Sequence, residues 1–277
     1  MTSSVAARPP LLAAVTLVVA AAGAAAQTSR EGHTVTLNGF EMYYETVGEG
    51  APLVLLHGWS GTGHDYDPFI DAFAEHYRLI LPDLRGHGRS TNPGGAFTMH
   101  QAALDVLGLL DHLGLERVRA VGASMGGITW YHVATQQPSR IERLVVIGAG
   151  NTFLPHCRSS MAATSADTYP QEWWRQMRMR HRYGDEQIEA IADMLPRFAA
   201  DETDVAFASE TLATISAPTL LIFGDRDWCF PVSMAVEIYE AIPDAALWVV
   251  PHGGHVPITG EHAPRFIETV LAFLGNE

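Results

Sequence analysis

The sequence contains no lysine, so each of its 17 basic residues is an arginine, and 31 acidic residues outnumber them. The formal net charge is −14 when histidine is counted as neutral. An acidic surface repels the phosphates of nucleic acids and the headgroups of anionic lipids. The charge balance therefore argues against nucleic acid and against stable membrane association of the mature protein.

Signatures of metal and nucleotide sites are also missing. The chain has 13 histidines, but it has no H-E-x-x-H motif and no cluster of cysteine and histidine, and no G-x-G-x-x-G follows an apolar run. Zinc sites and dinucleotide sites depend on these spacings, because the spacing places several ligands on one centre. We therefore expect no metal and no cofactor.

Cysteine is scarce: Cys157 and Cys229 are the only two, so a single pairing is available. Proteins of oxidising compartments often join such a pair in a disulfide. Two separately buried thiols are the alternative, because the distance between two Cα atoms cannot be read from a sequence. The sequence leaves the disulfide open.

Only the N-terminus carries an apolar run of more than a few residues with a basic start. Arg8 precedes apolar residues 11–22, and Gly23 and three alanines follow before Gln27. This pattern is typical of a secretory signal peptide, and it is too short for a mature membrane span. We expect a signal peptide over residues 1–26, cleavage after Ala26 and a secreted or periplasmic protein. A retained membrane anchor is the alternative.

Short apolar runs recur along the rest of the chain. Two alternating runs flank Asn38-Gly39, which is the pattern of a β-hairpin. Six later runs are continuously apolar, as strands covered on both faces are. Segments of helical spacing separate most of them, which predicts a doubly wound α/β sheet. The six runs are residues 53–56, 79–81, 118–121, 144–147, 220–223 and 247–250.

One connection is much longer than the others. Residues 151–216 contain no run that suits a strand, but they carry helical segments rich in aromatic residues and methionine. We interpret this stretch as a helical cap over the end of the sheet. Part of its aromatic content is expected to roof an apolar pocket.

Gly122-Ala-Ser124-Met-Gly126 follows the apolar run at residues 118–121. This spacing places a serine on a sharp turn between a strand and a helix, where flanking glycines leave room for a strained backbone. A pentapeptide of this kind occurs by chance in about one chain in ten of this length. The remaining motifs must therefore decide whether Ser124 is a nucleophile.

Two further strand ends supply what a serine nucleophile needs, a base and an acid that orients the base. Asp225 and Asp227 follow the run at residues 220–223, and His252 and His255 follow the run at residues 247–250. An open parallel sheet gathers such residues at the carboxyl ends of its strands. The chain order is therefore serine, aspartate, histidine.

These stretches make the chain resemble the α/β-hydrolase superfamily from about residue 30 onward. The family has a mostly parallel eight-stranded sheet flanked by helices, with a helical cap inserted after the sixth strand. The resemblance implies a core over residues 27–150 and 217–277 and a cap over residues 151–216. The matching motifs are His57-Gly-Trp59, Pro82-Asp-Leu-Arg-Gly-His-Gly-Arg-Ser90, Gly122-Ala-Ser-Met-Gly-Gly127, Gly224-Asp-Arg-Asp227 with Pro231, and Gly253-Gly-His255.

The resemblance also implies the role of each catalytic residue. Ser124 matches the nucleophile, Asp227 the orienting acid and His255 the base. Asp225 and His252 match less well and remain the alternatives. Ala123 departs from the histidine of many relatives, which leaves the triad intact but weakens assignment to a subfamily.

The resemblance further implies the surroundings of the nucleophile. The backbone N–H groups of Trp59 and Met125 are expected to form the oxyanion hole. We expect the substrate pocket to include Trp173, Trp174, Trp228 and Val256.

We therefore expect a secreted serine hydrolase that cleaves carboxylic ester or lactone bonds of small to medium apolar substrates through an acyl-enzyme. Serine in place of aspartate argues against epoxide hydrolases and haloalkane dehalogenases. An aminopeptidase similar to proline iminopeptidases is one alternative, in which Asp201, Glu202 and Asp204 would hold the substrate amine. A C–C bond hydrolase and a cofactor-free perhydrolase share the same triad. A non-catalytic binding protein on this scaffold belongs to a different class.

Overall fold

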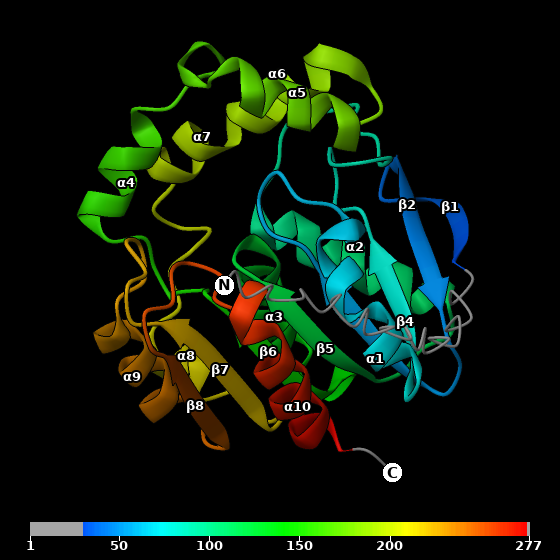
Figure 1. Cartoon of the computed structure of the whole chain (residues 1–277), viewed down its shortest axis with the longest axis vertical. Coiled ribbons are helices and arrows are strands. Elements are labelled where there is room, and N and C mark those ends of the chain that lie inside the picture. The colour runs from blue at the N-terminus through cyan, green and yellow to red at the C-terminus, as the bar shows by residue number, and fades with distance from the viewer. Residues whose placement is uncertain (1–29, 276–277) are drawn as a thin grey trace, which may run out of the picture.

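The computed structural model describes residues 30–275, in which helices cover both faces of one sheet and a further group of helices stands above it (Figure 1). The expected signal peptide, residues 1–26, lies outside the described residues. Over residues 30–275, no helix combines the length and the apolar character that crossing a membrane requires.

The sheet contains eight strands in the order β1-β2-β4-β3-β5-β6-β7-β8. The pairs β1–β2 and β2–β4 are antiparallel, and the pairs from β4–β3 to β7–β8 are parallel. The mostly parallel eight-stranded sheet expected from the sequence is confirmed. The strands are β1 (Glu31–Leu37), β2 (Phe40–Val47), β3 (Ala51–Leu56), β4 (Tyr77–Pro82), β5 (Val118–Ala123), β6 (Ile141–Ile147), β7 (Thr219–Gly224) and β8 (Ala245–Val250).

The turn between β1 and β2 forms at the dipeptide that predicted it. Asn38 has a φ of 47° and Gly39 a φ of 79°. Positive φ at both positions is what a two-residue type I′ hairpin requires, and asparagine and glycine accept it at low cost. Leu37 and Phe40 are paired directly across the turn.

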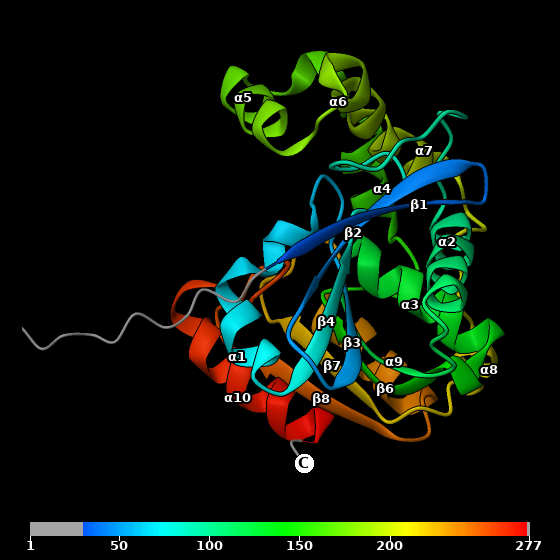
Figure 2. The ribbon, with the colours of Figure 1, turned by 90° about the vertical axis from the view of Figure 1, so that its right-hand side faces the viewer.

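Helices cover both faces of the sheet (Figure 2). On one face lie α1 (Ile70–Ala74) and α10 (Ala263–Leu274), and on the other lie α2 (Met99–His112), α3 (Met125–Gln136), α8 (Ser209–Leu212) and α9 (Val232–Ala241). Successive side chains of a strand point to opposite faces. Leu53 and Leu55 of β3 accordingly pack in the core beneath α1 and α10, while Val54 and Leu56 pack in the core beneath α2 and α3.

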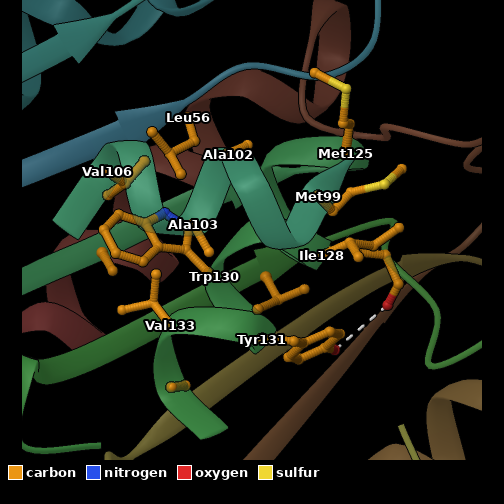
Figure 3. Packing of buried hydrophobic residues seen from close by; sticks show 14 of the residues in the cluster. Leu56, Met99, Ala102, Ala103, Val106, Met125, Ile128, Trp130, Tyr131 and Val133 are labelled. Atoms are coloured by element: carbon orange, nitrogen blue, oxygen red, sulfur yellow. Dashed lines mark hydrogen bonds between the residues drawn. The ribbon is translucent and has the colours of Figure 1, made fainter. Parts of the chain in front are cut away.

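The packing of α2 against α3 fixes the helix that begins at the predicted nucleophile. Figure 3 shows Ala103 and Val106 of α2 beside the ring of Trp130 in α3. Trp130 is fully buried, and its indole N–H donates a hydrogen bond to the carbonyl of Val121 in β5 (3.0 Å). This bond links α3 to the strand that precedes it, so it restrains the turn between β5 and α3.

The cap enters and leaves the sheet at neighbouring strands. The helices α4 (Pro155–Ala162), α5 (Gln171–Arg180), α6 (Gly184–Ala192) and α7 (Met194–Ala200) lie between β6 and β7 and stand above the sheet, at the end opposite the C-terminus (Figure 1). Thr152 and Ala206 form an isolated β-bridge, and the N–H of Phe207 donates to the carbonyl of Asn151 (2.9 Å). The expected helical cap after the sixth strand is confirmed.

The end of α5 docks on the loop that follows β4. The N–H of Gly88 donates to Nδ1 of His181 (2.8 Å), and the N–H of Arg182 donates to the carbonyl of Gly88 (3.0 Å). Burial, reinforced by the neighbouring His57, lowers the pKa of His181 to about 4. The ring is therefore neutral near pH 7, which lets it accept the hydrogen bond. His87, in the same buried cluster, also has a pKa well below its usual value because it is buried.

Candidate active site

Ser124 lies on a sharp turn between the end of β5 and the start of α3. Its φ of 51° and ψ of −118° fall outside the regions that a residue with a side chain normally occupies. A Cβ on Gly122 would collide with the backbone of Gly126, and a Cβ on Gly126 would collide with the carbonyls of Leu56 and His57. Only glycine fits at both flanks. This is the geometry of a nucleophile elbow, which exposes the serine hydroxyl.

His255 connects Ser124 to Asp227 by two hydrogen bonds. Its Nε2 lies 2.8 Å from Ser124 Oγ, and its Nδ1 lies 2.8 Å from Asp227 Oδ2. The Asp227 side chain is fully buried, and its Oδ1 accepts hydrogen bonds from the backbone N–H groups of Cys229 and Phe230. A carboxylate at Nδ1 keeps the proton on that nitrogen, so Nε2 is left to accept the proton of the serine. The structure thus brings the three predicted residues together.

The two alternatives for the acid and the base lie elsewhere. The Asp225 side chain is exposed, and its backbone N–H donates to the carbonyl of Val250 in a turn. His252 is also exposed, and its Nδ1 contacts the guanidinium of Arg226. Neither side chain is hydrogen-bonded to Ser124 or His255.

The two expected oxyanion donors flank the serine. Met125 is the first residue of α3, and Trp59 lies in the loop after β3. This loop passes close to the elbow, since a Cβ on Gly58 would lie 3.4 Å from the Cβ of Ser124. Among residues 30–275, neither the N–H of Trp59 nor the N–H of Met125 has a hydrogen-bond acceptor. Unpaired N–H groups beside a nucleophile can stabilise the oxyanion of a tetrahedral intermediate.

Ser124 borders a cavity of about 820 Å³ that core and cap residues line together. Trp228 and Val256, which were expected in the pocket, do line it. The sequence did not single out most of the other apolar lining residues, because they come from separate segments that only the folded chain brings together. Six of the apolar lining residues are Met99, Ile128, Phe153, Met161, Leu195 and Phe198.

Trp173 and Trp174 do not line this cavity, contrary to expectation. Trp173 stacks on Trp59 instead, with ring centroids 6.2 Å apart and an angle of 18° between the rings. Trp174 packs within the cap, where its indole N–H donates to the carbonyl of Ala166 (3.3 Å) and the Arg178 guanidinium lies over its ring. Trp173 therefore connects the cap to the loop after β3, and Trp174 contributes to the packing of the cap itself.

One arginine lines the cavity among the described residues. Arg180 donates a hydrogen bond to the carboxylate of Asp65 (2.7 Å), which also lines the cavity. Asp67, a further carboxylate on the same side, is paired with Arg30 (2.6 Å). The charges at this end of the cavity are thus neutralised within the protein.

The acidic residues that could have held a substrate amine have other partners. The carboxylate of Asp204 accepts hydrogen bonds from the N–H groups of Met99 and His100 in the first turn of α2 (2.7 and 3.0 Å). Asp201 accepts from the N–H of Thr203 (2.7 Å). Neither of them lines the cavity, and neither does Glu202. Asp204 caps a helix, because its negative charge satisfies two free N–H groups there.

Cys157 of α4 and Cys229 of the loop after β7 form a disulfide, with Cα atoms 5.0 Å apart. The sequence had left this pairing open. Both cysteines line the cavity, and Cys229 also donates a backbone hydrogen bond to Asp227. The disulfide therefore ties the cap directly to the loop that carries the buried acid.

Comparison with known proteins identifies a family to which most of the chain is similar. A family model described as alpha/beta hydrolase fold matches residues 51–187 and 151–260. The soluble epoxide hydrolase of a Corynebacterium species is 39% identical over 128 residues, which are 44% of this chain and 45% of that enzyme. The match therefore spans less than half the length of the epoxide hydrolase.

Two other similar proteins are matched over most of their length. The 2-hydroxy-6-oxo-6-phenylhexa-2,4-dienoate hydrolase of Burkholderia cepacia is 26% identical over 285 residues, covering 87% of this chain and 93% of that protein. The crystal structure of the enol-lactonase of Burkholderia xenovorans has a TM-score of 0.72 and 25% identity, covering 87% of this chain and 99% of that one. The names of these similar proteins describe hydrolases with different substrates: an epoxide, a dienoate and an enol lactone.

Proposed function

Because the chain belongs to the alpha/beta hydrolase fold family, we propose that it is a serine hydrolase that cleaves carboxylic ester or lactone bonds of small to medium apolar molecules. The observation that carries this proposal is a serine on a strained elbow, hydrogen-bonded to a histidine that a buried aspartate orients. The apolar cavity beside the serine supports an apolar substrate.

The proposed reaction has two halves. Ser124 attacks the carbonyl carbon while its proton passes to His255 Nε2, and the oxyanion accepts hydrogen bonds from the N–H groups of Trp59 and Met125. His255 then gives the proton to the leaving alcohol, which departs and leaves an acyl-enzyme. Water, deprotonated by His255, attacks the acyl-enzyme and releases the acid, and the proton returns to Ser124.

A charged substrate fits the cavity less well than a neutral one. A dienoate, the substrate class in the name of the Burkholderia cepacia relative, carries a carboxylate. Among the described residues that line the cavity, the only arginine is Arg180, and Asp65 already pairs with it. Burying a carboxylate without a cation is costly. The site therefore favours a neutral ester or lactone over a dienoate.

Epoxide hydrolysis and aminopeptidase activity also lack support in this site. Epoxide hydrolysis by this fold uses a carboxylate nucleophile, and Ser124 occupies that position here. A free amine would need an unpaired acidic partner in the cavity. Asp201 and Asp204 have other partners and do not line it. The two described carboxylates that do line it, Asp65 and Asp67, are paired with arginines.

A substrate panel tests the proposal. It comprises p-nitrophenyl esters of increasing acyl length, lactones, aminoacyl anilides and a ring-cleavage dienoate. We expect turnover of esters and lactones, with kcat/KM rising about two- to fourfold for each added methylene until the cavity is filled, because each buried methylene contributes about 0.8 kcal/mol. The Ser124→Ala variant measures the background for each substrate. Faster turnover of the dienoate or of an anilide than of any ester would contradict the proposal.

We further propose that the protein acts outside the cytoplasm. The basic and apolar N-terminal sequence supports export, and the Cys157–Cys229 disulfide suits an oxidising compartment. On expression of the full chain in a bacterium with a periplasm, we expect the mature protein to begin at Gln27. Mass spectrometry of the N-terminal peptide from each cell fraction checks this, and an intact Met1 peptide in the cytoplasm would contradict it.

A further inference from the structure

Trp59 belongs to the core and lines the cavity, and its side chain contacts the cap. The indole N–H donates a hydrogen bond to the carbonyl of Ile191 in α6 (2.8 Å). The backbone N–H of the same residue has no acceptor among the described residues and is one of the two proposed oxyanion donors. A single residue therefore connects the cap to the oxyanion hole.

Aromatic rings of the cap hold the indole from a second direction. Trp173 of α5 stacks on Trp59, and Tyr169, just before α5, lies with its ring centroid 5.9 Å from that of Trp59. Tyr169 and Trp173 are themselves stacked, with centroids 4.1 Å apart. Offset stacks of this kind favour one relative orientation of the rings. The position of the indole is therefore set by the hydrogen bond to α6 and by the stack on α5.

Hydrogen bonds within the core restrain the backbone on either side of Trp59. The loop turns sharply, since Ser60 has a φ of 59° and the N–H of Gly61 donates to the carbonyl of Gly58 (3.1 Å). His57 accepts a hydrogen bond from the N–H of Leu84 (2.9 Å) at Nε2, and its Nδ1–H donates to the carbonyl of Gly58 (2.8 Å). Between these anchors, the cap restrains Trp59 through the hydrogen bond and the ring contacts of its indole.

We infer that Trp59 is a positioning residue through which the docked cap orients the backbone N–H that stabilises the oxyanion. The inference rests on the proposed serine hydrolase function and assigns a catalytic consequence to cap residues that do not touch the substrate. Misplacing a catalytic group by about 1 Å can cost a hundredfold in rate. Loosening the cap contacts of Trp59 should therefore slow catalysis without a matching loss of ground-state binding.

Trp173→Ala is the decisive variant, because Trp173 contacts Trp59 but does not line the cavity. We expect kcat for a p-nitrophenyl ester to fall about ten- to a hundredfold, with KM changed by less than about threefold. The affinity for a trifluoromethyl ketone, which forms an oxyanion adduct on the serine, should fall by the same factor as kcat. The affinity for the product alcohol should stay unchanged.

Trp174→Ala is the matched control. Trp174 is the next residue of the same helix and donates its own indole hydrogen bond to the carbonyl of Ala166. Its ring meets Trp173 edge-on, with centroids 5.6 Å apart, but it makes no ring contact with Trp59. Trp174→Ala removes an indole from the same helix and leaves both cap contacts of Trp59 in place, so its losses in kcat and in trifluoromethyl ketone affinity should be much smaller than those of Trp173→Ala. Trp173→Phe retains a ring for the stack and should recover most of the lost kcat, which separates a positioning role from a failure to fold.

A double variant tests the route. If Trp173 acts through Trp59, then combining Trp173→Ala with Trp59→Ala, which leaves no ring for the stack, should lower kcat little more than Trp59→Ala alone. Equal losses in Trp173→Ala and Trp174→Ala, or full additivity in the double variant, would overturn the inference and leave the proposed function intact. A wild-type protein that turns over no ester or lactone would overturn the proposed function, and the role of Trp59 with it.

Discussion

Replacement of Ser124 by alanine is expected to lower ester hydrolysis by a factor on the order of 10⁶ and to abolish labelling by a fluorophosphonate. The acyl-enzyme cannot form without the serine oxygen that accepts the acyl group. Alanine differs from serine only by the hydroxyl, so the strained backbone at this position is expected to persist. Kinetics with a p-nitrophenyl ester and intact-mass measurement after labelling provide the two readouts.

Ser159→Ala is a suitable control for the serine substitution. Ser159 is exposed on α4, where its hydroxyl donates a hydrogen bond to the carbonyl of Pro155 (2.8 Å). Its replacement should leave the labelling rate and the kinetics within about twofold, as is usual for exposed substitutions. Equal labelling of wild type and Ser124→Ala would contradict the assignment of Ser124 as the nucleophile.

Replacement of Asp227 by asparagine is expected to lower kcat by about a thousandfold or more. The amide oxygen of asparagine can still accept the N–H groups of Cys229 and Phe230, so the loop should keep its shape. The amide NH₂ would however face Nδ1 of His255 and favour the tautomer that carries its proton on Nε2. In that tautomer the histidine cannot accept the proton of Ser124. Steady-state kinetics at neutral pH, with thermal unfolding as a check of the fold, measure the effect.

Asp225→Asn removes the same charge two residues away. Asp225 is exposed and is not hydrogen-bonded to His255, so its replacement should change kcat by less than about twofold. A larger loss from Asp225→Asn than from Asp227→Asn, with both variants folded, would reverse the choice of the orienting acid.

The sheet and the triad could be predicted because local sequence determines them. Strands β3 to β8 each contain a short apolar run, and Ser124, Asp227 and His255 each follow one of these runs. Once the strands are parallel, their carboxyl ends meet at one edge, so chain order alone places the three residues near one another. Glycine spacing around Ser124 then predicts the strained turn.

The surroundings of the triad could not be predicted in the same way, because they depend on how the cap packs. The sequence predicted both Trp228 and Trp173 in the pocket, and it did not distinguish Trp228, which lines the cavity, from Trp173, which stacks on Trp59. Asp204 looks like an amine ligand in the sequence, yet it caps a helix that begins 105 residues earlier at Met99. Such contacts join segments that are far apart in the chain. Periodicity and motif spacing describe neighbouring residues and do not indicate which distant segments touch.

The bridge between Thr152 and Ala206 draws the two ends of the cap together at adjacent strands of the sheet. The three triad residues lie outside the stretch between those ends, so the catalytic groups are encoded outside the cap, whereas core and cap residues line the cavity together. A cap of another length could be grafted at this junction without changing the strand register. Such a graft would still have to provide a carbonyl and an aromatic surface for the indole of Trp59. Compatibility between a foreign cap and this core thus includes the contacts of Trp59 as well as the disulfide and the contact of α5 with the loop after β4.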